Sequence, residues 1–216
     1  MADYRAVLFD MDGTLNDSGP GIMNSVRFAM RQMGRPEPDE ATLRKFIGPS
    51  LVYSFQTFTG MTEAEAVEAT AAYRECYRGG EIFNLTIYDG NLELLADLNR
   101  AGVRCAVVTS KPTMMTDLVL DHFDLRKYFA AVASPQPDDI SNDKSFLIQK
   151  ALGILGLEAK DAVMVGDTKF DMLGAKKAGC DAIGVRYGYG TEEELRASGA
   201  DFLVDRPAEI RAIVGI

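Results

Sequence analysis

The sequence predicts an α/β fold, with a doubly wound, mostly parallel sheet of the Rossmann type and one inserted helical domain. Short apolar runs alternate with helical patterns along most of the chain, and one long segment holds helical patterns only. The runs are continuous, as in strands buried on both faces of a parallel sheet. Five runs are clear and a sixth is weaker: 6–9, 105–108, 162–165, 182–185 and 202–204, then 130–133.

Helical patterns separate these predicted strands. Leucines recur at helical spacing over 92–98, and amphipathic patterns cover 115–122 and 148–155. Gly102 and Gly179 follow helical patterns, where a left-handed C-terminal residue is expected. Alternating strands and helices imply right-handed crossovers, with helices on both faces of the sheet.

Residues 17–86 interrupt the alternation, because they contain no strand-like run. Thr62 is expected to cap a helix there, with Glu65 as its capping-box partner. We therefore predict a core domain of residues 1–16 and 87–216 and an inserted helical domain of residues 17–86. The helical patterns of the insertion lie at 22–33, 39–46, 50–58 and 63–77.

Composition excludes several classes of protein. The chain has 216 residues, 32 acidic against 23 basic, and a net charge of −9, which disfavours a nucleic-acid partner. Its single His excludes zinc motifs with two histidines, and its three widely spaced Cys suggest neither a zinc ribbon nor a disulfide framework. No apolar run approaches a membrane span, and residues 1–5 lack a basic region followed by a long apolar stretch, so we expect no signal peptide. We therefore expect a cytoplasmic protein with no membrane partner.

Polar side chains follow three of the predicted strands. Asp10 and Asp12 follow the first, Thr109 and Lys111 the second, and Asp167 the third. Because the carboxyl ends of parallel strands meet at one edge of the sheet, where ligands bind, we expect these groups to converge. Asp-x-Asp-Gly-Thr taken alone is equally consistent with an Asx turn that closes a strand. Several carboxylates near one point instead indicate a site for Mg²⁺.

Four motifs, in order along nearly the whole chain, resemble those of the haloacid dehalogenase-like hydrolase superfamily. They are Asp10-Met11-Asp12-Gly13-Thr14, Thr109 after an apolar strand, Lys144, and Gly166-Asp167 with Asp171. The combination is specific, whereas one motif would not be. The resemblance implies a phosphatase that acts on a small phosphomonoester.

The first motif implies the chemistry. By resemblance, Asp10 is the nucleophile that attacks phosphorus and forms an aspartyl-phosphate. Asp12 is the general acid that protonates the leaving alcohol and then the base that activates water. Members that act as dehalogenases lack this second Asp, so Asp12 favours phosphoryl transfer.

The resemblance also assigns the groups that hold the phosphate. Thr109, Ser110 and Lys144 are implied to bind the transferring phosphoryl oxygens. The Lys-Pro pair often found in the family is missing from 135–145, so Lys144 is chosen because it begins a helical pattern. Lys111 remains the competing candidate.

A Mg²⁺ ion is implied at the same place. The carboxylates of Asp10 and Asp167 and the backbone carbonyl of Asp12 would bind it, while Asp171 would support the metal or orient Lys144. A carboxylate that attacks an anionic phosphate is repelled until a cation and a lysine neutralise the pair. The four aspartates, Lys144 and Mg²⁺ together leave one negative charge.

The position of the insertion resembles that of the small helical cap of this superfamily, which closes over the site. Within it, 44–50 is the predicted specificity loop, and Lys45 is the candidate contact for a substrate anion. The alternative is an exposed basic pair that complements a helix end. Segments 46–51, 109–112 and 188–195 resemble the phosphoglycolate phosphatase-like branch, which includes 5′-nucleotidases.

Two other functions stay open at this stage. One is a sugar-phosphate mutase of the same superfamily, which would return the phosphoryl group to its substrate. The other is a non-enzymatic regulatory or binding protein on the same scaffold, against which the intact set of motif residues argues. Gly188-x-Gly190 is interpreted as a loop, because its surroundings lack the pattern of a dinucleotide-binding fingerprint.

Overall fold

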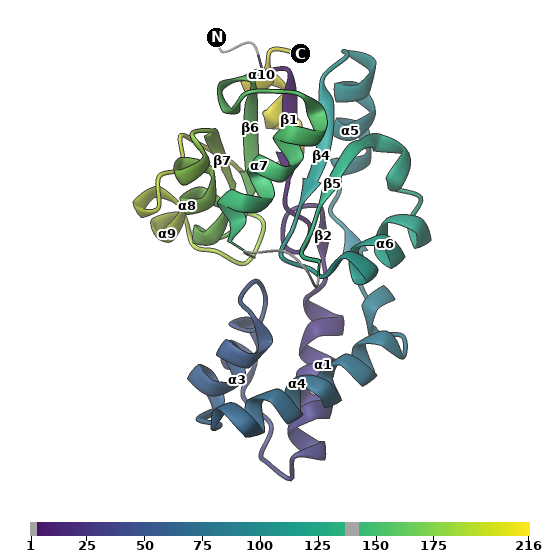
Figure 1. The fold of residues 1–216 in the computed structure, drawn as a ribbon, viewed down its shortest axis with the longest axis vertical. Coiled ribbons are helices and arrows are strands. Elements are labelled where there is room, and N and C mark those ends of the chain that lie inside the picture. The colour runs from purple at the N-terminus through teal and green to yellow at the C-terminus, as the bar shows by residue number, and fades with distance from the viewer. Residues whose placement is uncertain (1–3, 137–142) are drawn as a thin grey trace. The chain divides into compact units, whose positions relative to one another are not determined.

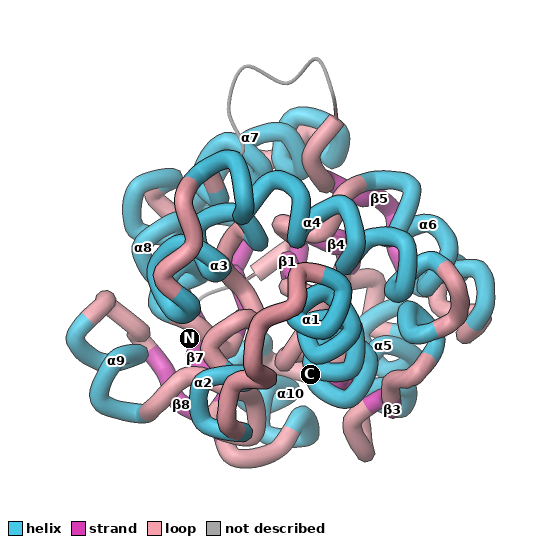
Figure 2. The backbone as a smooth tube through the Cα atoms, turned by 90° about the horizontal axis from the view of Figure 1, so that it is seen from below, coloured by secondary structure: helices cyan, strands magenta, loops and turns pink. Residues whose placement is uncertain are grey.

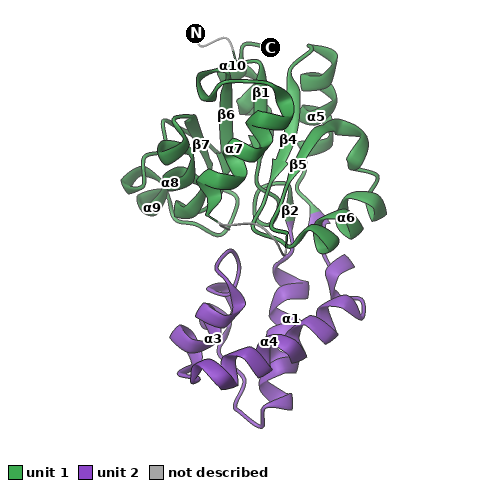
Figure 3. Cartoon of the chain, in the orientation of Figure 1, with its two compact units in different colours: residues 1–16, 87–216 green, residues 17–86 purple. Residues whose placement is uncertain are grey.

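The structure is a computed structural model that describes residues 4–136 and 143–216 (Figure 1). The chain divides into two compact units (Figure 3). Unit 1 comprises Met1–Asn16 and Ile87–Ile216, and unit 2 comprises Asp17–Thr86. Two-residue strands, β2 (Asn16–Asp17) and β3 (Thr86–Ile87), pair where the chain passes between the units.

Unit 1 is built on a six-stranded sheet in the order β5-β4-β1-β6-β7-β8, in which every neighbouring pair is parallel. The predicted α/β class with a parallel sheet and a helical insertion is confirmed. From β1 the chain builds the sheet first to one side and then to the other, so the winding reverses at β1. The strands are β1 (Ala6–Phe9), β4 (Arg104–Val108), β5 (Phe129–Ala133), β6 (Ala162–Gly166), β7 (Asp181–Val185) and β8 (Phe202–Val204).

Both faces of the sheet are buried, which explains why the strands read as continuous apolar runs. Ala6 and Leu8 belong to an apolar cluster with residues of α7 and α8, while Val7 and Phe9 are buried on the opposite face. Figure 2 shows α7 and α8 on one side of the sheet and α5 and α10 on the other. The helices are α5 (Asn91–Arg100), α6 (Thr113–His122), α7 (Lys144–Leu155), α8 (Lys169–Ala178), α9 (Glu192–Ala197) and α10 (Ile210–Val214).

Left-handed glycines end the helices as the sequence predicts. Gly179 ends α8 with φ +83°, and Gly102 follows α5 with φ +79°. Other side chains avoid this conformation, so glycine stops each helix at low cost. Short 3₁₀ turns complete the chain: η1 (Glu81–Phe83), η2 (Arg126–Tyr128), η3 (Ala159–Asp161) and η4 (Pro207–Glu209).

Unit 2 is helical, and α1 packs along α4. The predicted capping box is confirmed: Thr62 caps α4, and both of its reciprocal bonds with Glu65 are present. Phe46 and Phe55 pack edge to face in the interior, with ring centroids 5.0 Å apart. The helices are α1 (Gly19–Gln32), α2 (Glu40–Arg44), α3 (Leu51–Thr59) and α4 (Glu63–Arg78). Within the described part of the chain, none of the helices has the length and apolar character needed to cross a membrane.

Candidate active site

The sequence-predicted polar groups of unit 1 lie at the carboxyl ends of three neighbouring strands. Asp10 follows β1, Thr109 follows β4 and Asp167 follows β6, and β1 is paired with both of the other strands. The backbone N–H of Asp10 donates to Val165 O at 2.9 Å, which extends the pairing of β1 and β6 up to the site. The fold thus brings these groups to the point where the winding of the sheet reverses, the usual ligand site of such folds.

The loop after β1 is a tight turn that holds the first motif. Met11 O accepts hydrogen bonds from the backbone N–H groups of Thr14, Leu15 and Asn16. Gly13 has φ +88°, and a Cβ there would lie 2.1 Å from Asp167 Oδ2. Glycine is therefore needed at this position for both conformation and space.

Lys144 lies between two carboxylates. Its Nζ is 2.8 Å from Asp10 Oδ1 and 2.8 Å from Asp171 Oδ1. The residue is only 7% exposed, and its place at the start of α7 brings it against α8, where Gly174 leaves room for it. Burial lowers the pKa of Lys144, but the two carboxylates outweigh that effect and raise the pKa above its usual range.

Asp171 serves two partners at once. Its Oδ2 accepts bonds from the backbone N–H and the hydroxyl of Thr168, at 3.0 and 2.8 Å, which caps the start of α8. Its Oδ1 faces Lys144. The helix cap therefore fixes the carboxylate that orients the lysine.

Asp167 is fully buried and held at both oxygens. The Thr14 hydroxyl donates to Oδ1 at 3.2 Å, and the backbone N–H of Tyr189 donates to Oδ2 at 2.9 Å. Tyr189 is not among the site residues predicted from the sequence. A usable signal was present, because Gly188-Tyr189-Gly190 follows the run 182–185, whose carboxyl end lies at the same edge of the sheet.

Asp10, Asp167 and Asp171 form a buried group that could hold a metal ion, with carboxylate oxygens within 4.8 Å of one another. Burial raises the pKa of Asp10 to about 6, against the opposing effect of Lys144. Burial and the two neighbouring carboxylates raise the pKa of Asp167 well above its usual range. A divalent cation, which takes oxygen ligands, would offset the repulsion between these buried carboxylates.

Lys111, the competing lysine of the sequence analysis, contacts a different aspartate. Its Nζ is 3.0 Å from Asp12 Oδ2, and its side chain is only 5% exposed. On the other side, Asn16 Nδ2 donates to Asp12 Oδ1 at 3.4 Å. The two lysines are thus divided between the aspartates of the first motif, Lys144 at Asp10 and Lys111 at Asp12.

The lysine pairing changes the charge balance that the sequence suggested. When all of these groups are ionised, Asp10, Asp12, Asp167 and Asp171 carry four negative charges and the two lysines carry two positive charges. The net charge of the ionised groups is therefore −2. One divalent cation would balance it.

The candidate phosphate-binding residues after β4 differ in exposure. Thr109 is buried, and its Oγ1 accepts a hydrogen bond from the backbone N–H of Lys111 at 3.2 Å. That bond uses an oxygen lone pair, so the hydroxyl hydrogen can still donate to a phosphoryl oxygen. Ser110 is exposed.

Lys45 lies in unit 2, and its contact with a substrate stays a prediction. It is exposed, forms the C-terminal cap of α2, and its Nζ lies 5.9 Å from the centre of the Phe58 ring. This geometry fits a cation that complements the end of α2 at least as well as it fits a contact with a substrate anion.

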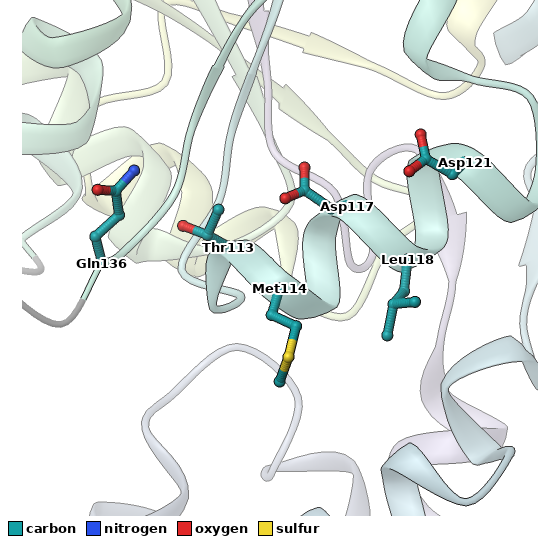
Figure 4. Close-up of a pocket in the computed structure, with 6 residues that line it drawn as sticks. All are labelled: Thr113, Met114, Asp117, Leu118, Asp121 and Gln136. Carbon is teal, nitrogen blue, oxygen red and sulfur yellow. The ribbon is translucent and has the colours of Figure 1, made fainter.

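A hollow of about 500 Å³ lies along α6, and neither Asp10 nor Asp12, Asp167 or Asp171 lines it. Figure 4 shows Met114 and Leu118 on one side of the helix and Asp117 and Asp121 on the other. Both of those carboxylates pair with Arg126. None of the predicted site residues is among those that line this hollow.

Comparisons with known proteins agree with the motifs. Residues 7–185 match the family model for haloacid dehalogenase-like hydrolases. A 5′-nucleotidase from Pseudomonas aeruginosa is 41% identical over 194 residues, 90% of this chain and 88% of that protein. A phosphoglycolate phosphatase from Vibrio parahaemolyticus is 30% identical, over 99% of this chain and 97% of the other. The crystal structure of a predicted phosphatase from Clostridium acetobutylicum has a TM-score of 0.91 at 36% identity and covers 99% of each chain.

Proposed function

Because the chain belongs to the haloacid dehalogenase-like hydrolases and is a phosphatase of that family, we propose that it hydrolyses a small phosphomonoester with Mg²⁺, through an aspartyl-phosphate on Asp10. The observation that carries the proposal is the buried group of Asp10, Asp167 and Asp171 with Lys144 bonded to two of its members. Burying several carboxylates together destabilises the folded protein unless cations bind among them.

Asp10 is the proposed nucleophile. Its carboxylate attacks phosphorus, the bond from phosphorus to the leaving oxygen breaks, and the phosphoryl group passes to Asp10. Lys144, 2.8 Å from Asp10 Oδ1, holds this carboxylate and neutralises charge that builds up on the phosphoryl oxygens. Thr109 donates its hydroxyl hydrogen to one of those oxygens, and Ser110 is the proposed further donor.

Asp12 is the proposed acid and base. In its protonated form it gives a proton to the leaving alcohol oxygen, and as a carboxylate it then takes a proton from the water that attacks the aspartyl-phosphate. Lys111 and Asn16 hold its two oxygens, which keeps the carboxyl group in one orientation between these steps.

Mg²⁺ would be held by the carboxylates of Asp10 and Asp167, with the Asp12 backbone carbonyl as the further proposed ligand and Asp171 in support. When bound, it would supply the positive charge that allows an anionic phosphate to approach Asp10. The oxygen-only donors and the net charge of −2 on the ionised groups support this choice of ion.

For unit 2 we propose the role of a cap that selects the substrate, with Lys45 as the candidate contact for an anionic group. The substrates to test first are phosphoglycolate, nucleoside monophosphates and sugar phosphates. Relatives of this chain are named phosphoglycolate phosphatase and 5′-nucleotidase.

The test is phosphate release from a panel of these metabolites and from p-nitrophenyl phosphate, with and without Mg²⁺. Asp10→Asn should lower the rate by at least about a thousandfold, since it removes the nucleophile. Asp124→Asn is the matched control, because Asp124 is exposed and has φ +53°, a conformation that Asn tolerates. Equal rates for wild type and Asp10→Asn would contradict the proposal.

A further inference from the structure

The loop after β7 packs directly against Asp167. β7 pairs with β6 in parallel, with Val165 opposite Ile183 and Gly166 opposite Gly184, so the carboxyl end of β7 lies beside Asp167. The segment Gly188–Gly190, called the clasp loop below, follows β7 and leads toward α9. None of the four motifs includes it.

The clasp loop touches Asp167 through backbone atoms. The N–H of Tyr189 donates to Asp167 Oδ2 at 2.9 Å. A Cβ on Gly188 would lie 2.3 Å from Asp167 Cβ and 2.4 Å from Gly13 O, and a Cβ on Gly190 would lie 2.0 Å from Asp167 O. Real Cβ atoms do not lie this close to atoms to which they are not bonded, so the loop reaches Asp167 only because both positions are glycine.

These contacts hold both oxygens of the Asp167 carboxylate. The residue is fully buried, Tyr189 N–H holds Oδ2, and the Thr14 hydroxyl holds Oδ1. Each carboxylate oxygen has two lone pairs and these hydrogen bonds use one on each, so lone pairs remain for a cation. Groups that orient a ligand in this way commonly determine metal affinity.

We propose that the clasp loop is a positioning element for the divalent cation. It fixes the Asp167 carboxylate through the Tyr189 N–H and requires glycine at 188 and 190 to do so. This inference rests on the proposed Mg²⁺ site, but it concerns residues outside the four motifs.

The test measures Mg²⁺ binding by calorimetry in the absence of substrate. Gly188→Ala and Gly190→Ala should each weaken binding by about tenfold or more, because the added methyl group pushes the loop off Asp167. Gly153→Ala is the matched control: Gly153 is exposed in α7 and has no atom within 4 Å of an added Cβ, so binding should not change. Turnover of the two loop variants should recover when Mg²⁺ is raised, and a cooperative melt of each metal-free variant shows that it is folded before Mg²⁺ is added.

Unchanged Mg²⁺ affinity in folded Gly188→Ala and Gly190→Ala would overturn the inference and leave the proposed function standing. A wild-type protein that binds no Mg²⁺ would overturn both. If the loop variants do not fold, the wild type decides: the Tyr189 amide resonance should shift on addition of Mg²⁺. An amide resonance that does not respond to saturating Mg²⁺ would contradict the inference.

Discussion

At the scale of single residues, the site is organised by two buried lysines with different partners. Lys144 bonds to Asp10 and Asp171, whereas Lys111 bonds to Asp12. The sequence left these two lysines as competitors, because spacing along a chain does not show which carboxylate a side chain reaches. The structure separates them by distance.

Lys144→Met should therefore impair both stability and catalysis. Removal of one partner from a buried ion pair costs about 3–5 kcal/mol, and loss of one charged contact to the transferring group costs about 10²–10³-fold in kcat. Lys160→Met, at a lysine whose side chain is 78% exposed, should change neither quantity. Urea denaturation and steady-state kinetics check both, and a Lys144→Met enzyme with wild-type kcat would exclude the proposed role.

The cysteines offer a second test at this scale. Burial raises the pKa of Cys105 to about 12, and burial, with a smaller effect of Asp181, raises that of Cys180 to about 11. The thiolate is the reactive form, so at about pH 8 these two groups should react slowly in the folded protein. Titration with a thiol reagent should find one fast thiol, the half-buried Cys76, and three after denaturation. Three fast thiols in the native protein would contradict the described burial.

At the scale of elements, strands were predicted more sharply than helices. Every strand of the sheet lies within one residue of its predicted run, because each is a continuous apolar run. The inner strand β1 is buried throughout, whereas the edge strands β5 and β8 are partly exposed. Helix starts follow the apolar spacing less closely: that of α7 starts at Ile148, whereas the prediction that Lys144 begins a helical pattern agrees with the observed start of α7. Its first turn is set by the Asp143 cap, which accepts a bond from Ser145 N–H at 2.7 Å, and not by apolar contacts.

The capping box of α4 provides a test of an element that the sequence predicted. Thr62→Ala should destabilise the protein by about 1 kcal/mol at neutral pH. The exposed substitution Thr57→Ala, in the last turn of α3, should be neutral or slightly stabilising. Denaturant melts of the two variants check this, and equal stabilities would show that the cap contributes nothing.

The same cap predicts a dependence on pH. The hydrogen bond from the Thr62 N–H, with contributions from Arg35, lowers the pKa of Glu65 from 4.5 to about 2. A depressed carboxyl pKa stabilises the folded state above the unfolded pKa, and the effect disappears as pH falls through the folded value. The penalty of Glu65→Gln, which removes the charge but keeps the size of the side chain, should therefore shrink as the pH falls from about 4.5 to about 2. A penalty independent of pH over this interval would contradict it.

At the scale of the whole molecule, the sequence predicted the fold class and which groups meet, but not how the fourth strand end contributes. The motifs direct attention to β1, β4 and β6, while Tyr189 reaches Asp167 from the loop after β7 through its backbone. A backbone N–H can donate whatever the residue type, so the identity of residue 189 does not predict this contact. Only Gly188 and Gly190 could have indicated it. A cytoplasmic location stays a prediction.

Metal binding should couple to the stability of unit 1. Mg²⁺ that binds only the folded state raises the melting temperature, and chelation should remove that gain together with activity. Because the metal-free pKa of Asp10 is raised to about 6, its protonated form competes with Mg²⁺ below that pH. The Mg²⁺-induced shift should thus be larger at about pH 7.5 than at about pH 5.5. The reverse order would contradict the assignment of Asp10 as a ligand.

The most direct test of the central claim is to trap the phosphoryl group. p-Nitrophenolate leaves without a proton, so Asp12→Asn should still be phosphorylated by p-nitrophenyl phosphate but should lack the base for the second step. After an acid quench in the presence of Mg²⁺, mass spectrometry should find one phosphoryl group on the peptide that contains Asp10, and none in Asp10→Asn or after chelation. Phosphate release by Asp10→Asn at the wild-type rate, or a phosphoryl group on a different residue, would contradict the account.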